Sequence, residues 1–306
     1  MVSNDIQDYI QPLHMNGMRG RVLRVPAAKT GQREILLLYG HHALIERWWG
    51  LVQNLAAFGT VTLPDLPGLG GMDSFYSIHR KPTLDTYADY LAAFVKMQYR
   101  NRRLTIIGIS FGFIIATRML QRYPELAKKV DLVVSIVGFM HYDDFLFPPE
   151  RRLFLARTAR ALSIPPIPFL FRYISLNHFV IKNIYTRTAS GKKRFREVGE
   201  DRFDELVRFE TRLWQENDVR THWRTTSEFL RLDNCIKEID LPLFHVTSSD
   251  DQYFDPAVVE QHMKVVYDDV TVGLMKSVSH TPSIVGTKEE LSVMVPTALK
   301  KILKRS

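Results

Sequence analysis

Cysteine is almost absent from this sequence. Cys235 is the only cysteine among 306 residues, so the chain cannot form an internal disulfide bond. The sequence also has no uninterrupted apolar run of about 18 residues, the length that a membrane-spanning helix needs. Its first residues lack the basic segment followed by an apolar segment that marks a secretory signal. Together these absences predict a protein of the reducing cytoplasm.

The positive charge of the chain is concentrated in its middle. The net charge is +8, and residues 147–231 alone contain 17 Lys or Arg against 10 Asp or Glu, an excess of +7. No zinc-finger spacing, RNP-type aromatic run or Arg/Lys tract accompanies this charge, so we expect no nucleic-acid partner. Two interpretations remain for the basic segment: a solvated surface, or a surface weakly attracted to membranes.

Short runs rich in aliphatic and β-branched residues, bounded by turn residues, predict the strands. They cover residues 21–25, 34–39, 60–63, 104–109, 130–137, 243–247 and 270–275. Helical patterns separate them, including one that Thr83 would cap, one over residues 111–122 and one that begins at Asp255-Pro256. This alternation predicts an α/β protein with a doubly wound, mostly parallel sheet covered on both faces.

The alternation of strands and helices is interrupted between residues 140 and 235. This segment contains the proline pairs 148–149 and 165–166 and helical patterns such as residues 201–216, but no strand pattern. Strand patterns return near residue 241. We therefore expect a core made of residues 1–139 and 236–306, with residues 140–235 inserted as a helical cap over one end of the sheet.

A candidate nucleophile stands between a predicted strand and a predicted helix. Residues 108–112 read Gly-Ile-Ser-Phe-Gly, which matches the pattern G-x-S-x-G around Ser110. A strand-to-helix turn this sharp holds the serine in a strained backbone conformation, and side chains at Gly108 and Gly112 would collide with the neighbouring helix and strand. A serine hydroxyl needs a base to take its proton. His280, directly after the last strand, is the candidate base.

The third member of such a triad is a carboxylate that follows the penultimate strand, because the chain order is serine, acid, histidine. Two adjacent aspartates stand there, Asp250 and Asp251, and the distance from the strand favours Asp251. Asp143 and Asp144, after the strand over residues 130–137, are an alternative, since some hydrolases place the acid at that point. The acid would hold the imidazole in the correct tautomer and stabilise its cation.

Two backbone N–H groups are expected to stabilise the oxyanion. One is that of Phe111, directly after the nucleophile, and the other comes from the loop after the strand over residues 34–39. Gly40 permits a close turn in this loop, and the His41 N–H is the predicted second donor. The neighbouring histidines at 41 and 42 point in different directions, and no further ligand follows at metal spacing, so we predict neither a metal nor a cofactor.

These motifs resemble those of the α/β-hydrolase superfamily along essentially the whole chain. Residues 38–41 (Leu-Tyr-Gly-His) are similar to the family's oxyanion loop, in which Tyr39 replaces a histidine, and residues 64–70 resemble the family's next loop, where Asp65 is structural. The tyrosine leaves the backbone donor in place but alters how the loop is anchored. The resemblance implies an eight-stranded sheet and a cap between the sixth and seventh strands.

Serine at position 110 argues against haloalkane dehalogenase and epoxide hydrolase chemistry, which this fold runs through a carboxylate nucleophile. We therefore expect a serine hydrolase that cleaves carboxylic esters through an acyl-enzyme, esterase- or lipase-like, with lactones as further substrates. A C–C bond hydrolase or an acyltransferase would use the same triad, and both alternatives remain open. A ligand-binding protein of this fold without activity is disfavoured, because no triad member is missing.

The cap sequence bears on the substrate. Residues 162–185 form a largely apolar stretch broken by prolines and flanked by basic residues. It is either the core of the cap or an apolar acyl pocket, lipid-facing in the second case. On the second interpretation Phe169 and Phe171 bind the acyl group of an apolar ester or lactone. Trp48, near the loop after Gly40, is a further candidate.

Overall fold

The computed structural model describes residues 5–27, 33–100, 102–175, 180, 202–248, 251–275 and 285–304. These residues form one eight-stranded sheet with the strand order β1-β2-β4-β3-β5-β6-β7-β8. The strands are β1 (Ile10–Met15), β2 (Met18–Val25), β3 (Arg33–Leu38), β4 (Gly59–Pro64), β5 (Leu104–Ile109), β6 (Val130–Ile136), β7 (Ile239–Thr247) and β8 (Tyr267–Leu274). β2 is antiparallel to both β1 and β4, and all other neighbours are parallel.

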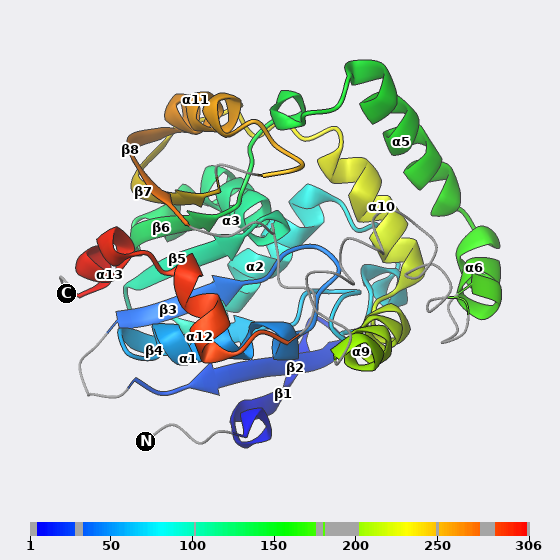
Figure 1. Cartoon of the computed structure of the whole chain (residues 1–306), viewed down its shortest axis with the longest axis horizontal. Coiled ribbons are helices and arrows are strands. Elements are labelled where there is room, and N and C mark those ends of the chain that lie inside the picture. The colour runs from blue at the N-terminus through cyan, green and yellow to red at the C-terminus, as the bar shows by residue number, and fades with distance from the viewer. Residues whose placement is uncertain are drawn as a thin grey trace.

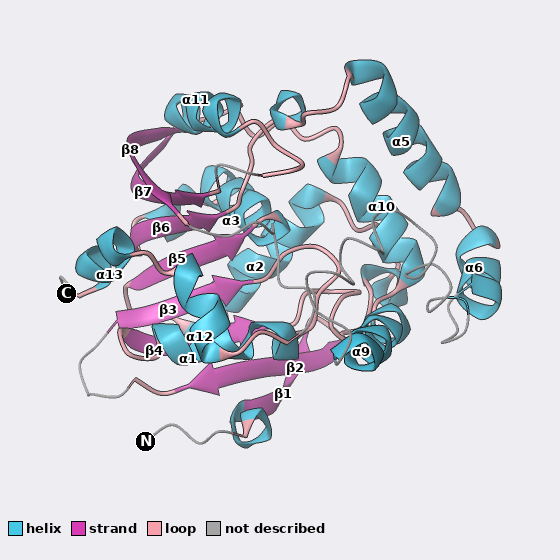
Figure 2. Ribbon diagram, in the orientation of Figure 1, coloured by secondary structure: helices cyan, strands magenta, loops and turns pink. Residues whose placement is uncertain are grey.

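Helices cover both faces of this sheet (Figures 1 and 2). The described core helices are α1 (Trp49–Leu55), α2 (Leu84–Gln98), α3 (Phe111–Arg122), α4 (Pro124–Ala127), α11 (Pro256–Val266), α12 (Lys288–Leu291) and α13 (Thr297–Leu303). Short 3₁₀ helices are η1 (Ile6–Tyr9), η2 (Ile45–Trp48), η3 (Phe75–Ile78), η4 (Tyr142–Asp144) and η6 (Ser292–Met294). In the view of Figure 1, α12 and α13 lie in front of the sheet and α2 and α3 behind it.

The predicted strands are confirmed, with ends that differ by a few residues. β5 and its neighbour β6 have almost continuously buried side chains, as expected of central parallel strands between two helical layers. β1 was not predicted. Its sequence contains Pro12 and His14, and only Leu13 and Met15 on it are buried. Proline is tolerated at the edge of a sheet, where no strand pairs on the outer side, but it obscures the strand pattern.

The helix starts that the sequence indicated are also confirmed. The Thr83 hydroxyl accepts a hydrogen bond from the Thr86 N–H at 3.2 Å and caps α2. Asp255 caps α11 by accepting hydrogen bonds from two N–H groups, and Pro256 is the first helical residue. α3 begins at Phe111, directly after β5, so the turn between them consists of Ser110 alone.

The helical insertion follows β6, as predicted. Its described helices are α5 (Pro149–Leu162), α6 (Ile167–Ser175), α9 (Phe203–Glu216) and α10 (Val219–Phe229). The parallel strands run toward this group of helices, so their carboxyl ends lie beneath it (Figure 1). Two ion pairs connect α9 to the core, Arg212–Glu46 and Arg47–Glu210. None of the described helices is both long and apolar enough to cross a membrane.

Candidate active site

Ser110 occupies the single-residue turn between β5 and α3, and its backbone is strained. Its φ and ψ angles are 46° and −112°, a conformation that residues with a side chain rarely adopt. Such a residue costs about 1–3 kcal/mol and is retained where the surrounding structure fixes it, often at functional sites. The Ser110 N–H donates to the Ile136 carbonyl at 3.0 Å, which fixes the turn to the end of β6.

The two glycines that flank the turn are required by close backbone contacts. A Cβ atom added to Gly108 would lie 2.4 Å from the Phe113 Cα in α3, and one added to Gly112 would lie 2.3 Å from the Leu38 carbonyl oxygen in β3. Both contacts are with backbone atoms, which cannot rotate away. The predicted reason for the glycines is therefore confirmed: α3 packs too closely on the sheet for any side chain at these two positions.

The loop after β3 lies next to Ser110. A Cβ atom added to Gly40 would be 3.5 Å from the Ser110 Cβ, so the two backbone segments are in van der Waals reach. Phe111 is the first residue of α3, and the N–H groups of a first helical turn have no acceptor within the helix. The structure thus brings the backbones of Gly40 and Phe111 together at the nucleophile, and His41, the predicted second donor, follows Gly40 directly.

The His41 side chain fixes this loop to the cap. Its Nε2 lies 2.8 Å from the Thr225 hydroxyl of α10, and its ring contacts those of Phe111 and His222. Burial lowers the pKa of His41 to about 4, so the imidazole is neutral at pH 7. No cluster of three or more metal-ligating side chains exists in the part of the chain that the structure describes.

Asp251 follows β7 and is held by its own loop. Its Oδ1 accepts hydrogen bonds from the N–H groups of Tyr253 at 2.9 Å and Phe254 at 3.3 Å. Both of these residues line the cavity that contains Ser110. Asp250, the neighbouring candidate, and His280, the candidate base, lie outside the described residues. β8 ends at Leu274, at the same edge of the sheet and six positions before His280 in the sequence.

Asp144, the alternative acid after β6, is already engaged elsewhere. Its Oδ1 lies 2.5 Å from the Nδ1 of His262 in α11, and its Oδ2 accepts hydrogen bonds from the N–H groups of Met140 and His141. The carboxylate is fully buried. These contacts connect the start of the cap to α11 and give Asp144 a structural role. Asp143 is largely exposed, 3.6 Å from the ring of His141.

A cavity of about 520 Å³ opens above Ser110, between the carboxyl ends of the strands and the cap. Aromatic residues supply much of its wall: Trp48, Phe111, Phe139, Phe145, Phe147, Trp223, Phe229, Tyr253 and Phe254. Leu155, Thr158, Ala159 and Leu162 of α5 close its outer side. Among the described lining residues, Arg47 alone carries a formal charge, and it is paired with Glu210 at 3.3 Å. The cavity is of ligand-binding size and suits an apolar, uncharged group.

The three predicted substrate-binding residues have different positions. Trp48 is buried and lines the cavity. Phe171 stands behind the wall, where its ring packs against those of Trp214 and Trp223. Phe169 is 62% exposed on α6 and is not part of the described cavity lining. Hydropathy indicated that this stretch is apolar but not which of its side chains face inward.

The cavity wall also contains residues that were not predicted. Phe139 and Phe145 follow β6, Phe254 follows β7, and Phe229 ends α10. The Phe139 and Phe254 rings are stacked, with centroids 4.3 Å apart. Phe139 and Phe145 lie after the carboxyl end of β6, which neighbours the nucleophile strand β5, and Phe254 lies after β7, the next strand of the sheet. That position was a usable signal, since the carboxyl ends of parallel strands share one edge of the sheet.

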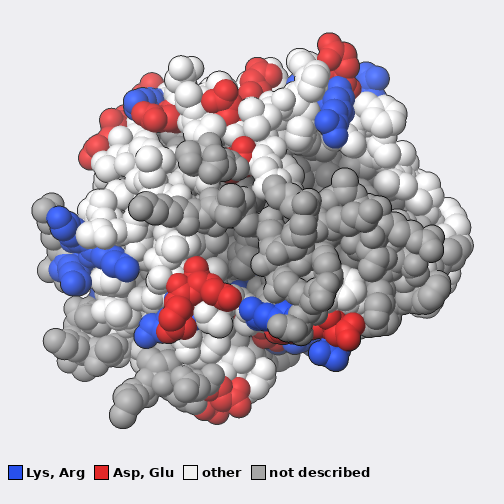
Figure 3. Space-filling model, in the orientation of Figure 1, with Lys and Arg blue, Asp and Glu red and all other residues white. Residues whose placement is uncertain are grey.

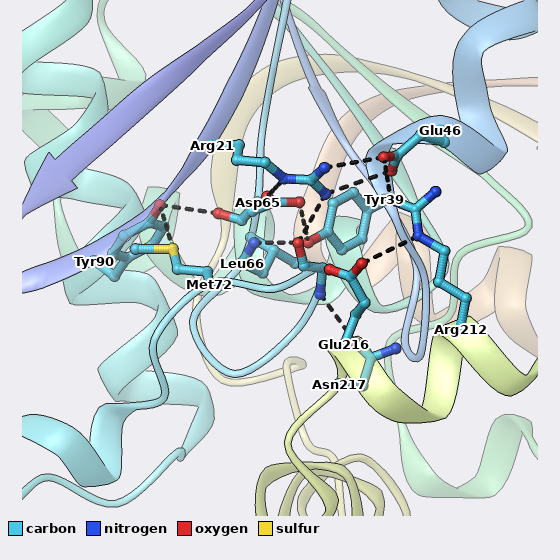
Figure 4. A network of polar contacts seen from close by, with 11 residues as sticks. Arg21, Tyr39, Glu46, Asp65, Leu66, Met72, Tyr90, Arg212, Glu216 and Asn217 are labelled. Carbon is cyan, nitrogen blue, oxygen red and sulfur yellow. Dashed lines mark hydrogen bonds and ion pairs between the residues drawn. The ribbon is translucent and has the colours of Figure 1, made fainter. Parts of the chain in front are cut away.

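A buried polar network supports the loop after β3 (Figure 4). The Tyr39 hydroxyl accepts a hydrogen bond from the Leu66 N–H at 2.8 Å and donates to Asp65 Oδ1 at 3.3 Å. Arg21 donates to Asp65 Oδ2 and to Glu46, both at 2.9 Å. Burial raises the pKa of Asp65 to about 8, although Arg21 opposes this shift. Asp65 thus has the structural role that the sequence indicated, in a network that reaches the cap through Glu46.

Comparison with known proteins agrees with this architecture. The family model described as "alpha/beta hydrolase fold" matches residues 35–264. A curated relative, an AB hydrolase superfamily protein of Gibberella zeae, is 29% identical over 140 residues. That match covers 45% of this chain and 47% of the relative, so it spans about half of the relative's length.

Two solved structures are similar over nearly the whole chain. A thermophilic esterase from Thermogutta terrifontis gives a TM-score of 0.65 at 14% identity and covers 96% of this chain and 98% of its own. An enol-lactonase from Burkholderia xenovorans LB400 gives 0.63 at 14% identity, with 96% and 97% covered. At this identity the likeness shows a shared fold.

Proposed function

Since the chain belongs to the α/β-hydrolase fold family, we propose that it is a serine hydrolase that cleaves carboxylic esters. In this proposal Ser110 is the nucleophile, His280 the general base and Asp251 the acid that orients it. The activity is esterase- or lipase-like, and lactones are further substrates. Neither a metal nor a cofactor takes part in the reaction.

The strained Ser110 turn at the floor of the apolar cavity carries this proposal. A serine that only capped a helix would have no need of positive φ or of glycines pressed against backbone on both sides. The turn sets the hydroxyl at the amino end of α3, where the helix dipole favours developing negative charge. The same point borders the cavity, so a bound ester would have its carbonyl group beside the hydroxyl.

The proposed reaction is acyl transfer from the ester to Ser110 and then to water. His280 takes the Ser110 proton while the Ser110 Oγ attacks the ester carbonyl, and the N–H groups of His41 and Phe111 stabilise the oxyanion. The tetrahedral intermediate collapses, the C–O bond to the alcohol breaks, and His280 returns the proton to the departing alkoxide. Water then attacks the acyl-enzyme by the same route and releases the carboxylic acid. Asp251 stabilises the imidazolium in both steps.

The cavity favours a neutral, apolar acyl or alcohol group. Aromatic side chains supply much of its described wall, and Arg47, the one formally charged residue of that described wall, is already balanced by Glu210. A carboxylate-bearing substrate would have to be desolvated without a free cationic partner on the described wall, which is costly. The fold-level likeness to an esterase and an enol-lactonase is consistent with ester and lactone substrates.

Covalent labelling tests the proposal. A fluorophosphonate probe should label the wild-type protein, and Ser110→Ala should abolish both labelling and the hydrolysis of p-nitrophenyl esters and lactones. Ser77→Ala is the matched control, because Ser77 is an exposed serine on η3 and should not affect either readout. Only the small residual rate that binding and the oxyanion donors supply should remain in Ser110→Ala. Labelling that survives this substitution would refute the nucleophile assignment.

A further inference from the structure

Exposed large apolar side chains are concentrated on one part of the cap. Of the fifteen such residues in the described chain, nine lie between residues 146 and 173. Phe154 on α5 and Tyr173 on α6 are 67% and 68% exposed. Leu153, Ile167, Phe169 and Leu170 belong to the same two helices, and with Phe154 and Tyr173 they form what we call the outer cap face. Scattered apolar residues on a surface need no explanation, whereas a concentration of them on two consecutive helices points to an interaction site.

The outer cap face lies at one edge of the molecule. In Figure 3 the margin that corresponds to α5 and α6 in Figure 1 is mostly white, with charged side chains gathered near the start of α5. α10 packs against both helices from the inside. Phe154, Phe169 and Tyr173, which are 67%, 62% and 68% exposed, therefore contribute little to packing within the described chain.

Helix α5 separates this surface from the cavity. Its small residues Ala156 and Ala159 are buried, and Leu155 and Leu162 line the cavity. Phe154 and Leu153 on the same helix are exposed. A ligand taken up at the outer cap face would thus be one helix away from the space above Ser110.

The charges around the outer cap face indicate an anionic partner. Arg157 and Arg160 are exposed on α5, and Arg172 is exposed on α6. Glu150 is the only acidic residue in the sequence of these two helices. Apolar residues interleaved with arginines are typical of helices that lie in the plane of a membrane interface. A second copy of the chain is a poor occupant by comparison, since a symmetric contact would bring these arginines against one another.

We propose that α5 and α6 dock on an anionic lipid bilayer and deliver lipid-soluble esters from it to the cavity above Ser110. The delivery step rests on the proposed function, whereas the docking step does not. Phe154 and its neighbours on the outer cap face enter the headgroup region, and Arg157 and Arg160 bind lipid phosphates and carboxylates. The proposed substrates of the Ser110 site are then apolar esters that partition into membranes.

Vesicle flotation tests the docking step. The full chain should float with vesicles of phosphatidylcholine and phosphatidylserine, bind vesicles of phosphatidylcholine alone more weakly, and detach as salt rises, because salt screens the arginines. Phe154→Asp and Tyr173→Asp should each weaken binding about tenfold or more, since each replaces a large apolar side chain by a charge. Val265→Asp is the matched control: Val265 is 55% exposed, but on α11, and this variant should bind like wild type.

Other results would overturn the docking step. The docking step is refuted if the wild-type protein floats with neither vesicle type, or if both outer-face variants float as wild type does. It is also refuted if Val265→Asp loses as much vesicle binding as the outer-face variants. A concentration-dependent dimer that Phe154→Asp dissociates, without vesicle binding, would assign the outer cap face to a second copy instead. Because both variants alter exposed residues, circular dichroism should show that they fold as wild type does. If one variant unfolds, the flotation of the other variant tests the docking step.

The delivery step has a separate readout. Phe154→Asp and Tyr173→Asp should retain fluorophosphonate labelling and the hydrolysis of a soluble short-chain ester. Their hydrolysis of a long-chain ester held in phosphatidylserine vesicles should fall about tenfold, because they bind these vesicles more weakly. Equal rates of wild type and variants on the vesicle-held ester would overturn delivery. Absence of labelling in wild type would instead refute the proposed function and leave the flotation result standing.

Discussion

The Tyr39 hydroxyl gives the sharpest stability prediction in this molecule. Tyr39 is fully buried, and Tyr39→Phe removes one oxygen atom with almost no change of shape. The variant deprives the Leu66 N–H of the acceptor that binds it at 2.8 Å, and it removes the longer, 3.3 Å hydrogen bond to Asp65. There is little room for a replacement water, because even a Cβ atom on Gly70 would lie 2.6 Å from the Tyr39 hydroxyl oxygen.

The expected magnitude follows from these contacts. A buried donor left without an acceptor costs about 1–3 kcal/mol, and the long bond to Asp65 adds little, so we expect a loss of about 2 kcal/mol in the free energy of unfolding. With an unfolding entropy of about 2.1 cal/mol/K per residue over 306 residues, that loss lowers Tm by about 3 °C. Calorimetry and urea denaturation should both detect it.

Tyr99→Phe is the matched control for this experiment. Tyr99 is 1% exposed, and its hydroxyl interacts with the side chain of Thr62 and not with a backbone N–H, so its removal leaves no buried backbone donor without an acceptor and should lower the free energy of unfolding by less than Tyr39→Phe does. The m-value of urea unfolding should be the same in both variants, since neither alters the surface that unfolding exposes. If Tyr39→Phe is no less stable than Tyr99→Phe, the hydroxyl does not anchor the loop and the reasoning fails.

Two further predictions concern the acid and the response to pH. Asp251→Asn should lower kcat for ester hydrolysis about 10⁴-fold. Asp144→Asn should chiefly lower the free energy of unfolding, because Asp144 already binds His262. A larger loss of kcat in a folded Asp144→Asn variant would assign the acid to Asp144. Burial lowers the pKa of His245 to about 4, and the unfolded chain therefore binds this proton first as pH falls from about 6.5, so stability decreases across that window. Replacing this histidine by glutamine should reduce the decrease of the urea midpoint between about pH 6.5 and 4, to which buried His41 also contributes. An unchanged dependence of the urea midpoint on pH would exclude His245 as a source of acid sensitivity.

The elements that were predicted most accurately are those whose signals are local. β5 and α3 were predicted to the residue, because a short apolar run ends at a glycine-flanked turn and Pro124 follows the helix. The Ser110 turn was predictable from its two flanking glycines. Gly108 is required by a close contact with the backbone of Phe113, and Gly112 by one with the backbone of Leu38 in the adjacent strand. β1 was missed because an edge strand has one open side and tolerates Pro12, so its sequence need not alternate.

The cavity wall and the polar network could not be predicted in this way. Phe145, Phe229 and Phe254 come from three separate segments that meet only in the folded chain. Arg21 and Glu46 lie 25 residues apart, and Arg21 on β2 contacts both Glu46 of η2 and the buried side chain of Asp65. The sequence pattern does not indicate which charged side chains will be buried together, because each of them also has polar neighbours in the sequence.

Helix α5 shows why the cap sequence was ambiguous. A helix that packs on one side needs one apolar stripe, and its opposite side is polar. In α5 the buried positions are taken by Ala156, Ala159 and Arg152, whose guanidinium donates to the Leu230 carbonyl, while Leu153 and Phe154 are exposed. Small residues let α5 approach α10 closely, so the large apolar residues are left for other surfaces. A hydropathy pattern assigns the largest apolar residues to the interior, and in this helix that assignment is inverted. The exposed Leu153 and Phe154 are part of the observation on which the proposed docking of the outer cap face rests.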